Sequence, residues 1–117
     1  MIETGVVIDL QGAPLHWHTP SNRTSVALPD SRELWDVLWN NRQNLQGFAH
    51  THPGRGLPSP SSEDLTTFAA IEAALGQRLS WWIVNEGHVV LLRWEGFYGA
   101  SFVPALPWTA QLRALSF

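Results

Sequence analysis

Apolar positions along the chain fall into short runs and helix-spaced stripes, with turn residues between them. Residues 2–10 (IETGVVIDL) form a β-branched apolar run that predicts a strand, and Gln11-Gly12 predicts a turn after it. Residues 14–20 (PLHWHTP) alternate weakly and predict a return strand, while residues 24–28 (TSVAL) predict another short one. The first part of the chain is therefore expected to form strands joined by turns.

Helical spacing of apolar residues follows. Asp30 is the expected N-cap of a first helix, Glu33 fits a capping-box-like start, and Gly47 is expected to end the helix as a C′ glycine. Residues 47–52 (GFAHTH) then predict a buried strand. The apolar stripe of this first helix consists of Leu34, Leu38 and Leu45.

A loop and a second helix come next. Residues 53–60 hold three prolines and two glycines, which indicates a loop. Ser61 or Ser62 is expected to cap the second helix, and Gly76 to stop it. The inward-facing residues of this helix are Leu65, Phe68, Ile71 and Leu75.

Three apolar runs near the end of the chain predict a β-meander, over residues 79–85, 88–94 and 97–103, and residues 108–115 predict a short helix. The order of strands, helix, strand, helix and strands is typical of the α+β class. We expect an α/β sandwich in which two main helices flank a mixed sheet.

Composition and charge exclude several classes of function. The chain has 117 residues, which predicts a single domain over residues 1–117, and its net charge of −3 offers no attraction for phosphate backbones. Cysteine is absent, which excludes disulfides, cysteine nucleophiles and cysteine-built zinc ribbons. No apolar run reaches the ~18–20 residues that span a bilayer, and the start MIETGVVIDL lacks the basic region of a signal peptide. We expect a cytoplasmic protein that binds neither nucleic acid nor membrane.

The segment GFAHTHPGRGLPSPSSEDL carries the candidate chemistry. His50 and His52 lie two positions apart in a predicted strand, so both imidazoles face the same side. Asp64 follows in the first turn of the second helix, where the helix dipole favours a carboxylate. Two imidazoles and one carboxylate are typical of a catalytic zinc site whose fourth position is left to water. The pair His16 and His18 has no such aspartate downstream, and we expect it to bind no metal.

The string HTHP followed by PSSED resembles the signature of the JAMM/MPN zinc metalloproteases, also called the Mov34/JAB family, in their small prokaryotic form. That signature includes a glutamate on an early strand, followed by a glycine and apolar residues, and the stretch Glu3-Thr4-Gly5-Val6-Val7 is similar to it. The resemblance covers roughly residues 2–103. It implies the cytidine-deaminase-like MPN fold.

The resemblance also implies a role for each matching residue. His50, His52 and Asp64 would hold Zn²⁺. Glu3 would be the general base that takes a proton from the attacking water. Ser61 would hydrogen-bond the oxyanion that forms at the attacked carbonyl. The implied reaction is hydrolysis of an amide or isopeptide bond.

Other carboxylates compete for these roles. Glu63 stands at the spacing from His52 that the family uses, one position before Asp64. Asp64 is preferred because it keeps the Ser-x-x-Asp phase with Ser61. Glu33 is the other early glutamate, and its place at a helix start indicates a capping residue rather than a base.

Members of the family often cut after the C-terminal glycine of a ubiquitin-like protein or a sulfur carrier. The resemblance therefore implies such a tail as substrate, bound in an extended form. Two alternatives stay open. One is an MPN-like scaffold that docks a protein partner without catalysis, although the retained zinc ligands argue against it. The other is a cell-wall or phage-tail peptidase that uses the same chemistry on a different substrate.

Overall fold

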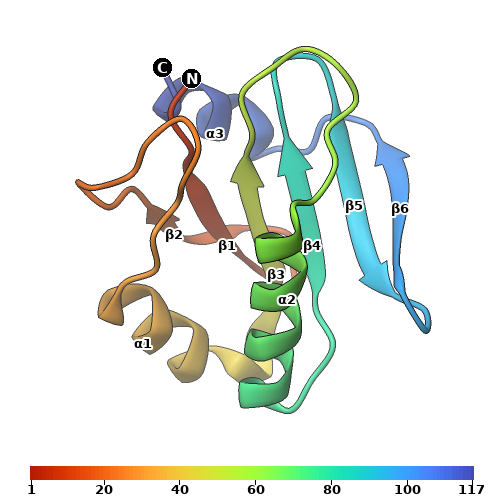
Figure 1. Ribbon diagram of the computed structural model, residues 1–117. Helices are drawn as coiled ribbons and strands as arrows, with labels where there is room; N and C mark the ends of the chain where they lie inside the picture. Colours follow the sequence, from red (N-terminus) through yellow and green to blue (C-terminus); the bar gives the residue numbers. More distant parts are fainter.

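Six short apolar segments pair into one mixed sheet in the computed structural model, which describes residues 1–117 (Figure 1). The strand order is β2-β1-β3-β4-β5-β6, and only β3 and β4 run parallel. The elements are β1 (Gly5–Asp9), β2 (Pro14–His18), α1 (Arg32–Asn40), the 3₁₀ turn η1 (Arg42–Asn44), β3 (Leu45–Thr51), α2 (Ser62–Leu75), β4 (Ser80–Val84), β5 (Val89–Trp94), β6 (Tyr98–Val103) and α3 (Thr109–Leu115). The predicted α+β class is confirmed.

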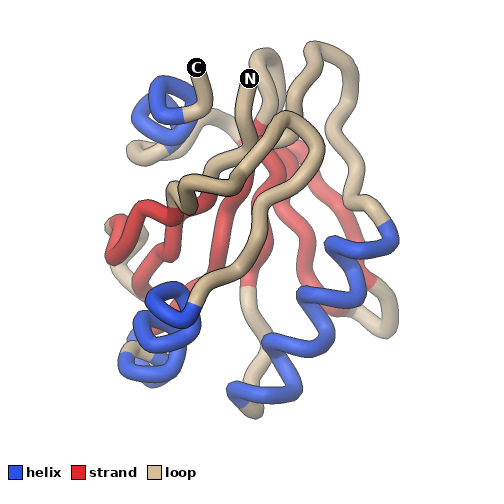
Figure 2. Tube along the Cα trace, turned by 60° about the vertical axis from the view of Figure 1, so that its left-hand side comes forward, coloured by secondary structure: helices blue, strands red, loops and turns tan.

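Each face of the sheet has its own apolar cluster, because side chains alternate along the strands. Helices α1 and α2 cover one face, where Phe48 and Trp81 are buried, and α3 covers the other through Trp108 (Figure 1). Trp81 and its neighbour Trp82 face opposite sides, as predicted, and the Trp82 and Trp108 rings lie 5.3 Å apart. The two termini lie side by side in both views (Figure 2).

The start of α1 differs from the prediction. Ser31 is the N-cap, since its Oγ accepts a hydrogen bond from Leu34 N at 3.1 Å. Asp30 instead accepts a hydrogen bond from Trp35 Nε1 at 3.2 Å. The expected Asp30 cap with a matching Glu33 was therefore wrong by one residue, because serine and aspartate compete for such positions on equal terms.

The end of α1 was also predicted wrongly. The helix ends at Asn40, where Asn41 Nδ2 donates to Val37 O at 2.8 Å, and Gly47 lies inside β3 rather than after a helix. A Cβ built on Gly47 would lie 1.6 Å from Ser80 O. The glycine is needed because β3 and β4 approach each other closely there.

Residues 24–28 form a loop and not the predicted strand. Thr24 N donates to Ala27 O at 2.9 Å, and Val26 N donates to Thr24 Oγ1 at 3.2 Å. These bonds close a turn within the segment, in place of the regular pairing along a neighbouring strand that a β-strand requires. Val26 is 85% exposed, which removes the burial that its β-branched side chain suggested.

The remaining elements match the sequence closely. Ser61 is the N-cap of α2, and Gly76 ends it in the left-handed conformation at φ 67°. The three strands of the meander and the short final helix are present. None of the helices combines the length and the apolar character needed to cross a membrane.

Candidate metal centre

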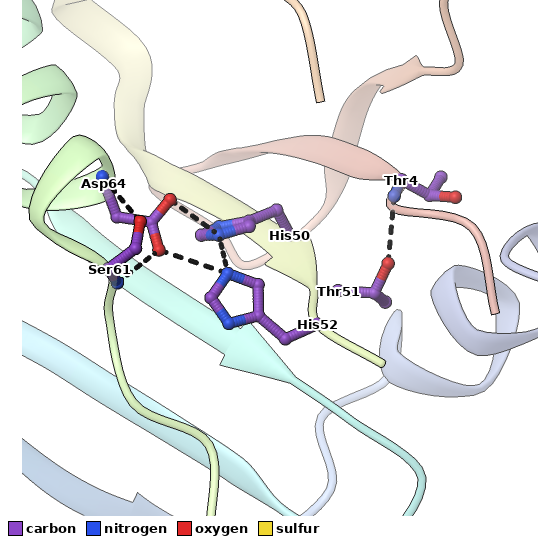
Figure 3. A network of polar contacts seen from close by, with 6 residues as sticks. All are labelled: Thr4, His50, Thr51, His52, Ser61 and Asp64. Carbon is purple, nitrogen blue, oxygen red and sulfur yellow. Dashed lines mark hydrogen bonds and ion pairs between the residues drawn. The ribbon is translucent and has the colours of Figure 1, made fainter. Parts of the chain in front are cut away.

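Two imidazoles meet at the end of β3. His50 is the penultimate residue of β3 and His52 follows its last residue, so the two side chains leave on the same face (Figure 3). The two Nε2 atoms lie 2.9 Å apart, and the ring centroids lie 4.7 Å apart. The predicted shared face of the pair is confirmed.

The first turn of α2 brings a carboxylate to these imidazoles (Figure 3). Asp64 Oδ1 lies 3.3 Å from His50 Nε2, and Asp64 Oδ2 lies 3.1 Å from His52 Nε2. A capping box fixes the aspartate, since Asp64 Oδ2 accepts a hydrogen bond from Ser61 N at 2.9 Å. The helix start therefore places Asp64 as the Ser-x-x-Asp spacing predicted.

A second carboxylate approaches from the amino terminus. Glu3 precedes β1, and one of its oxygens lies within 4.8 Å of ring nitrogens of His50 and His52. These three residues form a group that could hold a metal ion. Glu3 is only 7% exposed despite its place near the chain end. The two imidazoles thus have two candidate carboxylates beside them, Glu3 and Asp64.

The donor atoms fit a small divalent cation. Tetrahedral zinc with bonds of 2.0–2.1 Å to nitrogen and oxygen keeps its ligand atoms about 3.3 Å apart. The contacts among His50, His52 and Asp64, at 2.9, 3.1 and 3.3 Å, are close to that spacing. The donors are nitrogen and oxygen without sulfur, which suits zinc and other borderline ions.

The ionisation of the cluster is set by burial and by Asp64. Burial lowers the pKa of His50, which favours the neutral imidazole that a metal requires. Burial also tends to lower the pKa of His52, but the hydrogen bond and the charge of Asp64 outweigh it and raise the pKa. Burial alone would raise the pKa of Asp64, yet hydrogen bonds from both histidines hold it well below its usual range. Asp64 is therefore an anion near neutral pH.

Glu3 differs from Asp64 in its electrostatics. The pKa of Glu3 is raised to about 7, chiefly by burial; the charge of His52 opposes the rise, and that of Asp64 adds to it. No side chain of the protein donates a hydrogen bond to the Glu3 carboxylate, and His52 is the one neighbour whose charge favours its ionised form. A carboxyl group with a pKa near the working pH is suited to accepting and returning a proton.

The neighbouring groups orient the ligands and leave one hydroxyl free. The Ser59 backbone lies beside His52 and adds slightly to the rise in the pKa of that imidazole, after the larger effects of burial and Asp64. Ser61 Oγ accepts a hydrogen bond from Asp64 N at 3.1 Å. That bond uses a lone pair of Ser61, so its hydroxyl proton remains available for another acceptor.

A cavity of about 540 Å³ opens beside the cluster. Its polar end includes Glu3, His50, His52, Ser61 and Asp64, so all the predicted site residues share one space. The apolar part of the wall comes from the sheet and from both helices on that face. Residues of this apolar wall include Leu34, Leu38, Phe48, Phe68, Ile71 and Trp81.

The other candidates stand apart from the metal group. Glu63 lines the cavity but makes no contact with the histidines, and Glu33 lies beside His16 at 4.0 Å. His18 is a buried part of the cavity wall that the sequence did not identify. Its Nε2 lies 2.6 Å from Pro29 O and holds the loop above the cavity. The His-x-His spacing in β2 predicts that His16 and His18 share a face of the strand. No local pattern predicts the contact between His18 and Pro29.

The chain matches no protein-family model, and a search of curated proteins finds no match. The interpretation of the site therefore depends on its residues and their geometry.

Proposed function

We propose that this protein is a zinc-dependent peptidase or isopeptidase with an MPN-type fold. The observation that carries the proposal is the convergence of His50, His52 and Asp64 within 3.3 Å of one another, with Glu3 beside them. Nitrogen and oxygen donors in this number are typical of catalytic zinc sites, which leave a coordination position open. A silent scaffold is disfavoured because all the donors are present and share one cavity.

His50, His52 and Asp64 would hold the metal. Bound zinc would act as a Lewis acid that makes water nucleophilic near neutral pH. Glu3 takes the proton of the attacking water and returns it to the leaving amine. Ser61 donates its hydroxyl proton to the carbonyl oxygen as negative charge develops there.

The different roles proposed for Asp64 and Glu3 follow from the different environments of their carboxylates. Asp64 lies within 3.3 Å of both imidazoles and stays ionised, which suits a ligand. Glu3 is buried without a hydrogen-bond donor and has a pKa of about 7, which suits a base. Pairs of carboxylates whose environments separate their pKa values are a recurring source of such paired roles.

The cavity favours an extended peptide tail as substrate. Its wall is apolar below the cluster, while Glu3, Asp30, Glu63 and Asp64 give its lining an acidic character without any arginine. Such a surface suits a tail that presents apolar side chains and no negative charge near the cleaved bond. The tail of a ubiquitin-like or sulfur-carrier protein is the substrate class we propose.

Zinc content and hydrolysis together test the proposal. We expect about one zinc per chain after zinc loading, measured by elemental analysis. His50→Ala should lose both zinc and hydrolysis, whereas Glu3→Gln should keep zinc and lose hydrolysis. The substrate is a ubiquitin-like protein joined to an amine through its terminal carboxyl group. His16→Ala is the matched control, because it removes an imidazole of β2 outside the cluster. A wild-type protein that takes up no zinc would contradict the proposal.

A further inference from the structure

The segment that carries Glu3 is held on both sides of that residue. Glu3 N donates to Thr24 O at 2.9 Å, and Ile2 N donates to Ser116 O at 2.6 Å. Thr4 N donates to Thr51 Oγ1 at 2.9 Å, so the residue after Glu3 is also anchored (Figure 3). These three bonds fix the backbone on both sides of Glu3.

Arg23 links the segment around Glu3 to the end of α3. Its Nη1 donates to Thr4 Oγ1, to Leu115 O at 3.1 Å and to Glu3 O at 3.5 Å. None of these acceptors is a carboxylate, so the guanidinium holds the backbone around Glu3 without pairing with its acidic group. Arg23, which lies in the loop after β2, therefore connects Thr4, just before β1, to Leu115 at the end of α3.

Thr51 continues the network on the face opposite the histidines (Figure 3). Its Oγ1 accepts from Thr4 N and lies 3.0 Å from Ser116 Oγ, which in turn lies 2.8 Å from Leu112 O. Ser116 therefore donates to Leu112 O, and Thr51 donates to Ser116. The residue between His50 and His52 is thus connected to the end of α3 and to the segment of Glu3.

We propose that Arg23 is a positioning residue that keeps the Glu3 carboxylate beside the two imidazoles. The proposal rests on the proposed role of Glu3 as the base. A base must lie within hydrogen-bond reach of the proton it removes, and a misplacement of 1 Å can cost about 100-fold in rate. Arg23 touches neither the imidazoles nor Asp64, so its removal should change catalysis without changing the metal ligands.

Arg23→Ala and Arg23→Lys test this, with Arg32→Ala as the control because Arg32 is exposed at the start of α1. In Arg23→Ala we expect the Glu3 and Thr4 amides to exchange about tenfold faster by NMR. Zinc content and KM should stay within twofold of wild type while kcat falls about 100-fold. Arg23→Lys should restore part of kcat, since an ammonium still donates to backbone oxygens.

Unchanged amide exchange in Arg23→Ala, or an unchanged kcat in an active enzyme, would overturn the proposal. If Arg23→Ala does not fold, Arg23→Lys carries the test, since it keeps the charge but loses most of the guanidinium donors and should give the same pattern in weaker form. If wild-type protein hydrolyses nothing, the proposed function fails. The exchange rates of the Glu3 and Thr4 amides then still decide whether Arg23 holds this segment.

Discussion

Ser61 and Asp64 hold each other across the start of α2, through Ser61 N to Asp64 Oδ2 at 2.9 Å and Asp64 N to Ser61 Oγ at 3.1 Å. The same Asp64 oxygen lies 3.1 Å from His52 Nε2. One capping box therefore stabilises the helix and aims the carboxylate at the candidate metal centre. Substitutions in it need controls that separate helix stability from site chemistry.

The identity of the third metal ligand can be decided by two isosteric changes. Asp64→Asn keeps an oxygen for the Ser61 backbone but removes the anionic ligand. We expect its zinc affinity to fall by more than the roughly 10–100-fold that a second-shell change costs. Glu3→Gln should retain wild-type affinity. Competition against a chromophoric chelator measures the zinc affinity of both variants. Loss of affinity in Glu3→Gln with wild-type affinity in Asp64→Asn would instead assign the ligand set to Glu3, His50 and His52.

The Ser61 hydroxyl can be tested apart from its capping role. Glycine is a tolerable N-cap, so Ser61→Gly should lower the unfolding free energy by only a few tenths of a kcal/mol. Loss of an oxyanion donor should lower kcat by about 10²–10³. Ser31→Gly is the control, because Ser31 Oγ caps α1 in the same way through Leu34 N. A Ser61→Gly enzyme with near-normal kcat would rule out the oxyanion role.

The close approach of β3 and β4 at Gly47 predicts a strong stability effect. Gly47→Ala would put a Cβ 1.6 Å from Ser80 O, which is backbone and cannot move alone. We expect a loss of about 3 kcal/mol or more in urea unfolding, at or beyond the upper end of usual overpacking costs. Gly56→Ala is the control, since a Cβ there meets no atom within 4 Å. Similar unfolding midpoints for the two variants would contradict the packing argument.

The proximity of His50, His52 and Asp64 was predictable because their geometry is local. The two-residue period of a strand places His50 and His52 together, and the capping-box spacing places Asp64 in the first turn of α2. Both rules need only a few neighbouring residues. The supports of Glu3 were not predictable, because Arg23 and the end of α3 reach it through contacts that are distant in sequence.

The errors in the fold have the same origin. Leu45 continues the helical spacing of Leu34 and Leu38, yet it is buried as the first residue of β3. A buried strand and a buried helix face both require apolar residues, so spacing alone cannot separate them. Gly47 suggested a helix end, but a glycine is required there because the backbone of Ser80 lies too close for a Cβ. No local pattern predicts that contact.

Glu72 gives the protein a buried carboxylate outside the candidate site. It accepts hydrogen bonds from Leu79 N at 2.8 Å, Trp81 Nε1 at 3.1 Å, Arg78 Nη1 at 3.2 Å and the Tyr98 hydroxyl. Burial alone would raise the pKa of Glu72, but these donors, led by Tyr98, outweigh it and hold the pKa below 4.5. The ionised form is therefore the one that stabilises the fold.

Acidic pH should lower the free energy of unfolding through protonation of Glu72. Because the folded pKa of Glu72 lies below its unfolded value, its contribution to stability is complete above about pH 4.5 and is lost as the pH falls through the folded pKa. Glu72→Gln should cost about 1.5–3 kcal/mol at neutral pH, and the difference from wild type should shrink below pH 4.5. Urea unfolding, monitored by tryptophan fluorescence, measures the difference in unfolding free energy between wild type and variant. Glu33→Gln is the control, because Glu33 is exposed. A difference that stays constant with pH would show that the charge of Glu72 contributes nothing.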